Sequence, residues 1–347
     1  MHIETKEVLG KWKEYTLTND HDMTVSVLNF GGIITKILVP DRNGYIENIV
    51  LGYKEYNDYE ENPNYFGAII GPVAGRIKAA SFDLDNKTFN LAANDGDNHL
   101  HGGPDGFHQV IWEVNSFKDQ NSVGLILTYK STDGEAGFPG NVGIKVTYTL
   151  TNENQLILDY IATSDEKTLL TLTNHTYFNL SGDLKTTVKE HTLYMDSSEF
   201  VELDEQLIPT SRKLNGEGTP FDFRDEQIIG DGLNDNYEQN KIVGNGYDHY
   251  FIFAKNSDHQ VVVKEPVQGR MMTVKTTQPG MVLYTANGLS EGLPLAEGLS
   301  KKYLGVCFET QASPASLHNA ELPSVILNKS DVYHQQTVFS FGLIDNN

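Results

Sequence analysis

The sequence has a single cysteine, Cys307, among its 347 residues. One cysteine cannot form an intramolecular disulfide, and it excludes a zinc module built from several cysteines. Basic residues are also few, because 26 Lys and Arg stand against 47 Asp and Glu and give a formal net charge of −21. Such an acidic surface repels phosphate backbones and anionic lipids, so we expect neither nucleic acid nor a membrane as a partner. The expected ligand is a neutral small molecule.

Long apolar runs are absent as well. No stretch of about 20 apolar residues occurs, which is the length that a membrane-spanning helix requires. The N-terminal segment carries Glu4, Lys6, Lys11 and Lys13 where a signal peptide would have its apolar core. With one cysteine and neither kind of segment, we expect a reducing, cytoplasmic location.

Helical periodicity is scarce, and 31 Gly and 12 Pro scattered along the chain leave little room for long helices. Instead, apolar and polar residues alternate with a period of two, which is typical of half-buried strands. The clearest case is a hairpin in which two alternating segments, 144–150 and 156–162, flank the polar turn 151–154. Further strands are expected at 25–28, 123–129, 168–172, 261–264, 281–286 and 338–341. Only 53–59 and 225–229 suggest short helical turns. The sequence therefore predicts one all-β domain over residues 1–347, a sandwich or a barrel.

The segment 95–103 is the first that could carry chemistry. His99 and His101 are one residue apart, so on a strand both side chains point to the same face. Gly102 and Gly103 follow and allow a backbone or a ligand to approach closely. Two other interpretations stay open. The segment is equally consistent with a turn that exposes both histidines, and His99, His101 and Asp105 together resemble a two-histidine, one-carboxylate metal site.

The second segment is 174–180, where His175 lies among Asn174, Thr176, Tyr177 and Asn179. A single histidine on an apolar strand is usually a satisfied core residue. Buried polar clusters are costly unless their groups are hydrogen-bonded, however, so this clustering indicates a site.

A glutamate on an apolar strand is the third candidate. Glu309 follows Val306, Cys307 and Phe308. Because glutamate is depleted in strands and in cores, it is either an outward-facing surface residue or a base held in place for a purpose. Two smaller features are Arg76 after Gly75, a forked donor, and the pair Asp248-His249.

Six short motifs follow one another in order: His-Leu-His-Gly-Gly at 99–103, Gly-Phe-Pro-Gly at 137–140, Asn-His-Thr-Tyr-Phe-Asn-Leu at 174–180, Tyr-Asp-His at 247–249, Thr-Gln-Pro-Gly at 277–280 and Phe-Glu-Thr-Gln at 308–311. In this order, on an all-β background, they resemble the aldose 1-epimerases, also called galactose mutarotases. The resemblance runs from about Leu9 to Phe341. It implies a single large antiparallel β-sandwich with few short helices, an open sugar cleft, no metal and no organic cofactor. It also implies an isomerase of hexose and galactose metabolism that interconverts the α and β anomers of free aldoses such as galactose and glucose, as a monomer or homodimer.

Carried over position by position, the resemblance also implies roles for individual residues. Glu309 matches the family's base and His175 its acid. The remaining matches are substrate-binding: Arg76, His101, Asp248, Gln278, Tyr177, Gly75 and Thr176. Many family members have Asn where this chain has Gly75, so any contact from that side chain is lost here.

Three other functions compete with this one. A relative that acts on hexose 6-phosphates would need extra cationic groups for the phosphate, and near the proposed site only Arg76 is visible. A non-catalytic sugar-binding sandwich would not need Glu309 and His175 together. A metal-dependent β-barrel enzyme would use His99, His101 and Asp105.

Overall fold

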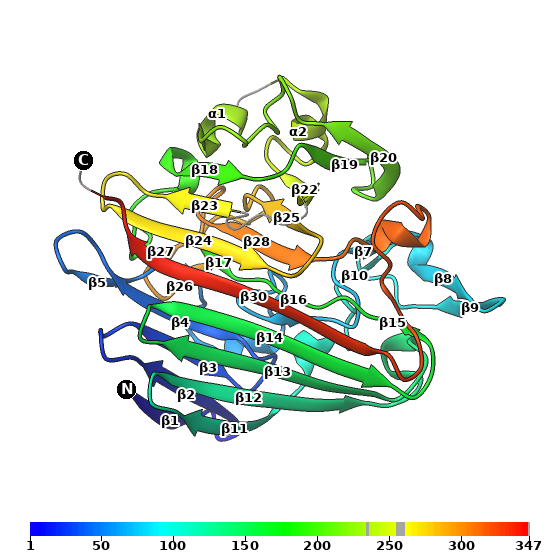
Figure 1. Cartoon of the computed structure of the whole chain (residues 1–347), viewed down its shortest axis with the longest axis horizontal. Helices are drawn as coiled ribbons and strands as arrows, with labels where there is room; N and C mark the ends of the chain where they lie inside the picture. The colour runs from blue at the N-terminus through cyan, green and yellow to red at the C-terminus, as the bar shows by residue number, and fades with distance from the viewer. Residues whose placement is uncertain (234–235, 255–260, 346–347) are drawn as a thin grey trace.

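Antiparallel strands make up almost all of the regular structure in the computed structural model, which describes residues 1–233, 236–254 and 261–345 (Figure 1). The largest sheet has nine strands. In sheet order they are β11 (Glu113–Lys118), β12 (Ser122–Ser131), β13 (Val142–Thr151), β14 (Gln155–Ser164), β30 (Val332–Leu343), β24 (Arg270–Thr276), β23 (Val261–Lys264), β18 (Thr192–Met195) and β21 (Gln227–Ile228). The all-β prediction is therefore confirmed.

Two further large sheets complete the sandwich. The six-stranded sheet has the order β17 (Tyr177–Phe178), β28 (Val306–Gln311), β25 (Gly280–Tyr284), β22 (Asp248–Ile252), β19 (Glu199–Leu203) and β20 (Pro209–Asn215). The five-stranded sheet consists of β1 (His2–Val8), β2 (Trp12–Thr18), β3 (Thr24–Leu28), β4 (Ile34–Pro40) and β5 (Ile46–Asn48). The largest apolar cluster takes side chains from all three sheets, including Val25, Val146 and Phe308. That 1–347 form one domain stays a prediction.

Short two-stranded sheets and helical turns lie in the connections. The pairs are β6 (Ile69–Ile70) with β16 (Thr173–Asn174), β7 (Arg76–Ile77) with β10 (His99–Leu100), β8 (Ser81–Leu84) with β9 (Lys87–Asn90), β15 (Thr168–Leu169) with β29 (Ile326–Leu327), and β26 (Pro294–Leu295) with β27 (Gly298–Leu299). The α-helices are α1 (Ile229–Leu233) and α2 (Glu238–Ile242). The 3-10 turns are η1 (Tyr56–Glu60), η2 (Lys78–Ala80), η3 (Phe107–Gln109), η4 (Glu135–Gly137), η5 (Val188–Glu190) and η6 (Pro314–Leu317). No helix in the described ranges has the length and apolar character needed to cross a membrane.

The predicted hairpin shows why these sequences form strands. Leu150 of β13 lies opposite Leu156 of β14, and Val146 lies opposite Tyr160. These four side chains are buried on one face, while the residues that alternate with them on the other face, such as Thr147 and Ile157, are partly exposed. The strand predicted at 168–172 is shorter in the structure: it pairs as a strand only over Thr168–Leu169, and Thr171 forms an isolated bridge with Val73. Likewise, the helical turn expected at 225–229 contains the two-residue strand β21, and α1 begins only at Ile229.

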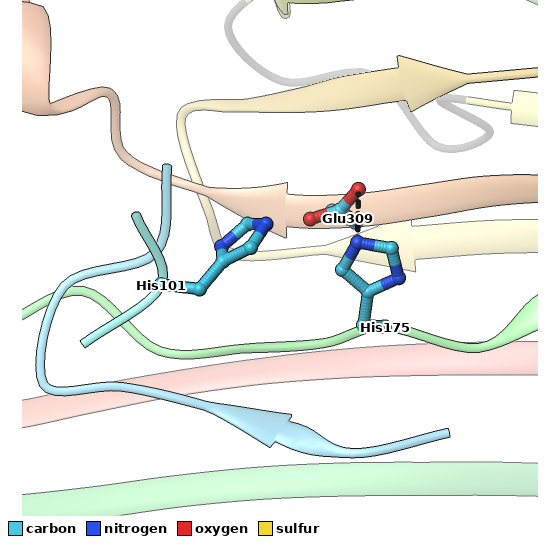
Figure 2. A group of neighbouring side chains, drawn as sticks. All are labelled: His101, His175 and Glu309. Atoms are coloured by element: carbon cyan, nitrogen blue, oxygen red, sulfur yellow. Dashed lines mark ion pairs between the residues drawn. The ribbon is translucent and has the colours of Figure 1, made fainter. Parts of the chain in front are cut away.

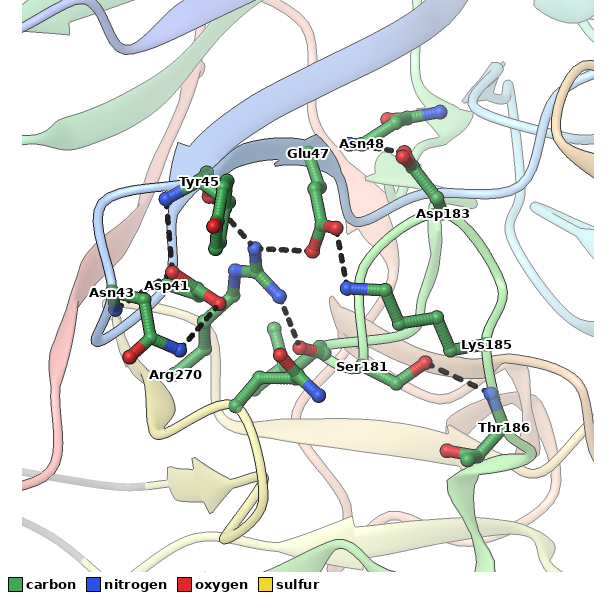
Figure 3. A network of polar contacts seen from close by, with 12 residues as sticks. Asp41, Asn43, Tyr45, Glu47, Asn48, Ser181, Asp183, Lys185, Thr186 and Arg270 are labelled. Carbon is green, nitrogen blue, oxygen red and sulfur yellow. Dashed lines mark hydrogen bonds and ion pairs between the residues drawn. The ribbon is translucent and has the colours of Figure 1, made fainter.

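A buried ion pair joins the five-stranded sheet to the nine-stranded one (Figure 3). The Arg270 side chain is only 1% exposed, and its Nη2 donates to Glu47 Oε2 at 2.7 Å. The same guanidinium donates to the Leu180 and Tyr45 carbonyls, both at 3.2 Å. Lys185 also donates to Glu47. Burial alone would raise the pKa of Glu47, but the hydrogen bonds from Lys185 and Arg270 lower it.

We expect Glu47→Gln to destabilise the fold by about 3 kcal/mol, because it leaves the buried Arg270 charge without its anion. Urea denaturation at neutral pH measures this loss. The matched control is Glu226→Gln, which breaks a pair with Lys264 that is at least 30% exposed on both sides; that change should cost below about 1 kcal/mol. Equal losses in both variants would contradict the structural role of the Arg270 pair.

Candidate active site

The six-stranded sheet places two carboxylates on one face. In β28, Cys307, Glu309 and Gln311 alternate onto the same side of the strand. Cys307 lies opposite Tyr284 of β25, and Tyr284 lies opposite Asp248 of β22. Because directly paired residues share a face, Glu309 and Asp248 point to the same side of the sheet, two strands apart.

Loops bring two histidines over this face (Figure 2). His175 lies between β16 and β17, and its backbone is bonded to a neighbouring turn: its N–H donates to the Ala68 carbonyl at 2.9 Å, and its carbonyl accepts from Gly67 at 3.0 Å. His101 directly follows β10, whose partner strand β7 begins at Arg76. The His101 N–H donates to the Gly75 carbonyl at 3.1 Å. Residues more than 200 positions apart in the chain thus meet at one place.

These side chains line a cavity of about 380 Å³. Seven of the residues singled out from the sequence line it: Gly75, Arg76, His101, His175, Tyr177, Asp248 and Glu309. Sequence analysis missed other lining residues, among them Tyr65, Asp95, Tyr284 and Asn287. Gln311 also lines the cavity, and the period of two from Glu309 would have identified it.

Two of the predicted substrate-binding residues do not line this cavity. The Gln278 side chain donates to the Leu172 carbonyl at 3.3 Å and to the Tyr333 hydroxyl at 2.9 Å, beside a separate, smaller cavity. The Thr176 hydroxyl is buried and donates to Asn174 Oδ1. Because the polar groups of both side chains bond to the protein away from the cavity, we do not retain them as sugar contacts.

His175 and Glu309 form the central contact of the cavity. His175 Nε2 lies 3.4 Å from Glu309 Oε1, and both side chains are about 95% buried or more. Burial raises the pKa of Glu309 well above its usual range, and the nearby Asp248 charge adds to this, while Arg76 partly opposes it. Burial lowers the pKa of His175 to about 3. A carboxylate with a raised pKa is a stronger base, and an imidazolium with a lowered pKa is a stronger acid.

The Nδ1 atoms of His101 and His175 have different partners. His101 Nδ1 accepts a hydrogen bond from the Gly75 N–H at 3.1 Å. Burial, with the charges of His175 and Arg76, holds the pKa of His101 well below its usual range, so its ring is neutral and carries hydrogen on Nε2. His175 Nδ1 lies 3.6 Å from Cys307 Sγ. Burial raises the pKa of this thiol well above its usual range, so it stays protonated.

Arg76 lies between two carboxylates. Its Nε donates to Asp95 Oδ2 at 2.6 Å, and its Nη1 donates to Asp248 Oδ2 at 3.4 Å. Burial raises the pKa of Asp248 to about 6 although Arg76 lowers it, so Asp248 is mostly ionised at neutral pH. With Glu309, the cavity wall therefore holds three carboxyl groups and one guanidinium. Alternating donors and acceptors of this kind suit a neutral, hydroxyl-rich ligand.

His101, His175 and Glu309 also have the ligand types of a metal site, with one potential ligand atom from each within 4.8 Å of the others. A histidine that binds a metal through one nitrogen normally donates the hydrogen on its other nitrogen to an acceptor. His101 has the opposite arrangement, because its Nδ1 accepts from Gly75. The group therefore fits proton transfer and hydrogen-bond donation better than metal binding. The alternative set also receives no support, because within the described residues neither His99 nor Asp105 joins a metal-ligand group.

Comparisons with known proteins agree with this geometry. A model of the family named aldose 1-epimerase matches residues 13–340. The galactose mutarotase of Sus scrofa is 35% identical over 337 residues, which covers 96% of this chain and 95% of that protein. The aldose 1-epimerase of Escherichia coli strain K12 is 31% identical over 94% of both chains. The crystal structure of galactose 1-epimerase from Lactobacillus acidophilus NCFM superposes with a TM-score of 0.87 at 30% identity and covers 99% of both chains.

Proposed function

Since the chain belongs to the aldose 1-epimerase family and is therefore an isomerase that exchanges the anomers of an aldose, we propose that Glu309 and His175 are its catalytic base and acid. The observation that carries this proposal is the 3.4 Å contact between their reactive atoms inside a buried cavity. A sugar ring needs one group that removes a proton and one that delivers a proton, and this pair offers both.

Ring opening needs two proton transfers, one from the anomeric hydroxyl and one to the ring oxygen. The ionised Glu309 removes the proton from the anomeric hydroxyl, and its electron pair forms the carbonyl of the open aldehyde. The bond between C1 and the ring oxygen breaks as the protonated His175 delivers its proton to that oxygen. Protons and electrons balance within the pair, so the step consumes no other reactant.

Rotation about the C1–C2 bond then presents the other face of the carbonyl. The ring oxygen attacks that face and returns its proton to His175, while Glu309 returns its proton to the carbonyl oxygen. The two half-reactions are the reverse of one another, so one acid and one base serve both directions.

The remaining cavity residues hold the sugar in place. His101 donates from Nε2 and Arg76 from its guanidinium to the ring-oxygen side of the sugar, where charge develops on opening. Asp248 accepts from ring hydroxyls. Tyr177 and Gly75 form part of the wall. Fixed donors and acceptors of this kind raise the rate by keeping C1 within reach of both catalytic groups.

Charge supports a free aldose rather than a sugar phosphate as the substrate. Asp95 and Asp248 already pair with the Arg76 guanidinium, and among the described residues no other Lys or Arg lines the cavity. A phosphate group would meet like charges there, and like charges at close range cost several kcal/mol. We therefore propose galactose, glucose or a similar neutral aldose as the substrate. We also propose a cytoplasmic monomer or homodimer, with Cys307 buried and reduced.

Glu309→Gln and His175→Asn should each lower kcat by about 10²–10⁴-fold, because each removes one of the two proton transfers. Polarimetry on freshly dissolved α-galactose and α-glucose measures this, after subtraction of the rate in buffer. The matched control is Glu14→Gln, which changes another buried glutamate that does not line the cavity. It should keep the wild-type rate. Nearly full activity in Glu309→Gln would refute the assignment of the base.

The pH dependence of kcat should follow from the shared proton. The pair holds one proton over a pH range that burial widens, by raising the pKa of Glu309 and lowering that of His175 to about 3. Within this range the reactive arrangement, with Glu309 ionised and the proton on His175, is a constant fraction of the pair. We therefore expect kcat to be flat at pH values above about 3 and to fall only where Glu309 loses its proton, at a pH well above the usual range of a glutamate. In His175→Asn the residual rate should instead rise with pH, because Glu309 must then be ionised. A wild-type rate that rises steadily through neutral pH would contradict this scheme.

Glucose 6-phosphate should react with a kcat/KM at least about 10-fold below that of glucose, which corresponds to about 1.4 kcal/mol of repulsion. Spectrophotometric assays coupled to an anomer-specific dehydrogenase for each sugar measure the two rates. Raising the salt concentration should narrow the difference, because salt screens repulsion between charges. A kcat/KM for the phosphate ester equal to or above that of glucose would favour the phosphosugar alternative.

A further inference from the structure

Tyr65 touches three histidines at the wall of the cavity. Its ring centroid lies 4.8 Å from that of His101, 4.9 Å from that of His108 and 5.8 Å from that of His175. The side chain is half-buried and lines the cavity. It therefore adjoins both His175, the proposed acid, and His101, the proposed donor.

The backbone of Tyr65 adopts a conformation that is rare for an aromatic residue. Its φ is +56°, in the left-handed region, and a residue held there costs of order 1–3 kcal/mol and persists only where its surroundings fix it. The turn supplies that restraint. The Tyr65 N–H donates to the Asn62 carbonyl at 2.8 Å, and the Asn62 side chain bonds both the N–H and the carbonyl of Phe66, at 2.9 and 3.2 Å.

The same turn is bonded to the segment that carries His175. Ala68 and Gly67 bond the His175 backbone on both sides, at 2.9 and 3.0 Å. The Tyr177 hydroxyl donates to the Asn64 carbonyl at 3.0 Å. Hydrogen bonds therefore fix the turn 62–68 against the segment 175–177, with the Tyr65 ring beside the imidazoles.

Ring packing is what holds the His175 imidazole. Its two polar neighbours are distant, with Glu309 at 3.4 Å and Cys307 at 3.6 Å. The contact with Glu309 is longer than a normal hydrogen bond between nitrogen and oxygen. The contact with Cys307 is made to sulfur, which is a weak hydrogen-bond partner. Tyr65 and Tyr177 pack against the imidazole, with the Tyr177 centroid at 5.1 Å. Without such packing, the imidazole can rotate away from Glu309.

We propose that Tyr65 is a positioning residue of the epimerase reaction, whose ring, fixed by the turn 62–68, holds the imidazoles of His175 and His101 toward the sugar. This inference rests on the proposed roles of His175 and His101. It concerns the ring and not the hydroxyl, which takes no part in proton transfer, because burial raises the pKa of Tyr65 and keeps the phenol protonated.

Tyr65→Gly and Tyr65→Phe test the proposal by polarimetry with galactose. Glycine adopts the left-handed backbone without strain, so Tyr65→Gly removes the ring and keeps the turn. We expect kcat to fall by up to about 10²-fold, as for a catalytic group displaced by about 1 Å, and KM to change much less. Tyr65→Phe should restore kcat to within about 2-fold of wild type, because it keeps the ring packing on which the alignment depends.

Leu9→Gly is the matched control, because Leu9 also has a left-handed backbone, with φ +55°, but is exposed and lies away from the cavity. It should leave kcat and KM unchanged. Wild-type kinetics in Tyr65→Gly, or an equal loss of kcat in Tyr65→Phe, would overturn the proposal. A readout independent of activity is the NMR spectrum of the histidine ring protons, where Tyr65→Gly should broaden the His175 signals and Tyr65→Phe should not. Failure of the proposed function itself would appear separately, as full activity in Glu309→Gln.

Discussion

The burial of His175 against Glu309 is the constraint on which the rest of the site depends. Removing two ionisable groups from water is costly, and here a single cause displaces their pKa values in opposite directions. The raised pKa makes the Glu309 carboxylate a stronger base and the lowered pKa makes the His175 imidazolium a stronger acid, as the proposed proton transfers require. Water would weaken both shifts, and the protein leaves only 2% of Glu309 and 4% of His175 exposed.

The fold divides this work between strands and loops. Glu309 and Asp248 project from inner strands of the six-stranded sheet, where neighbours on both sides fix the backbone. His175, His101 and Arg76 come from short connections that fold back over that face. A rigid floor with groups contributed by surrounding loops is a common way to build a site, because loops tolerate change while the sheet preserves the geometry.

The sequence predicted the site residues on the strands of the six-stranded sheet better than those on the surrounding loops, for a physical reason. The period of two is a local property, so it placed the hairpin 144–162 on the correct face and identified Glu309 as an unusual strand residue. Tyr65 has no such signal, because its position depends on a left-handed turn whose bonds run to a distant segment. Gln278 is a different case. It lies just before β25, where the alternation has not begun, and its amide bonds to Leu172 and Tyr333.

Gly75 shows how a site can change its side chains and keep its chemistry. With a φ of +88°, this position needs the left-handed backbone that glycine and asparagine adopt most readily. Those are the two residues expected here, glycine in this chain and asparagine in many members of the family. What His101 receives from position 75 is the backbone N–H, which either residue supplies. The hydrogen on His101 Nε2 is thus set by the conformation of the main chain and not by the side chain at position 75.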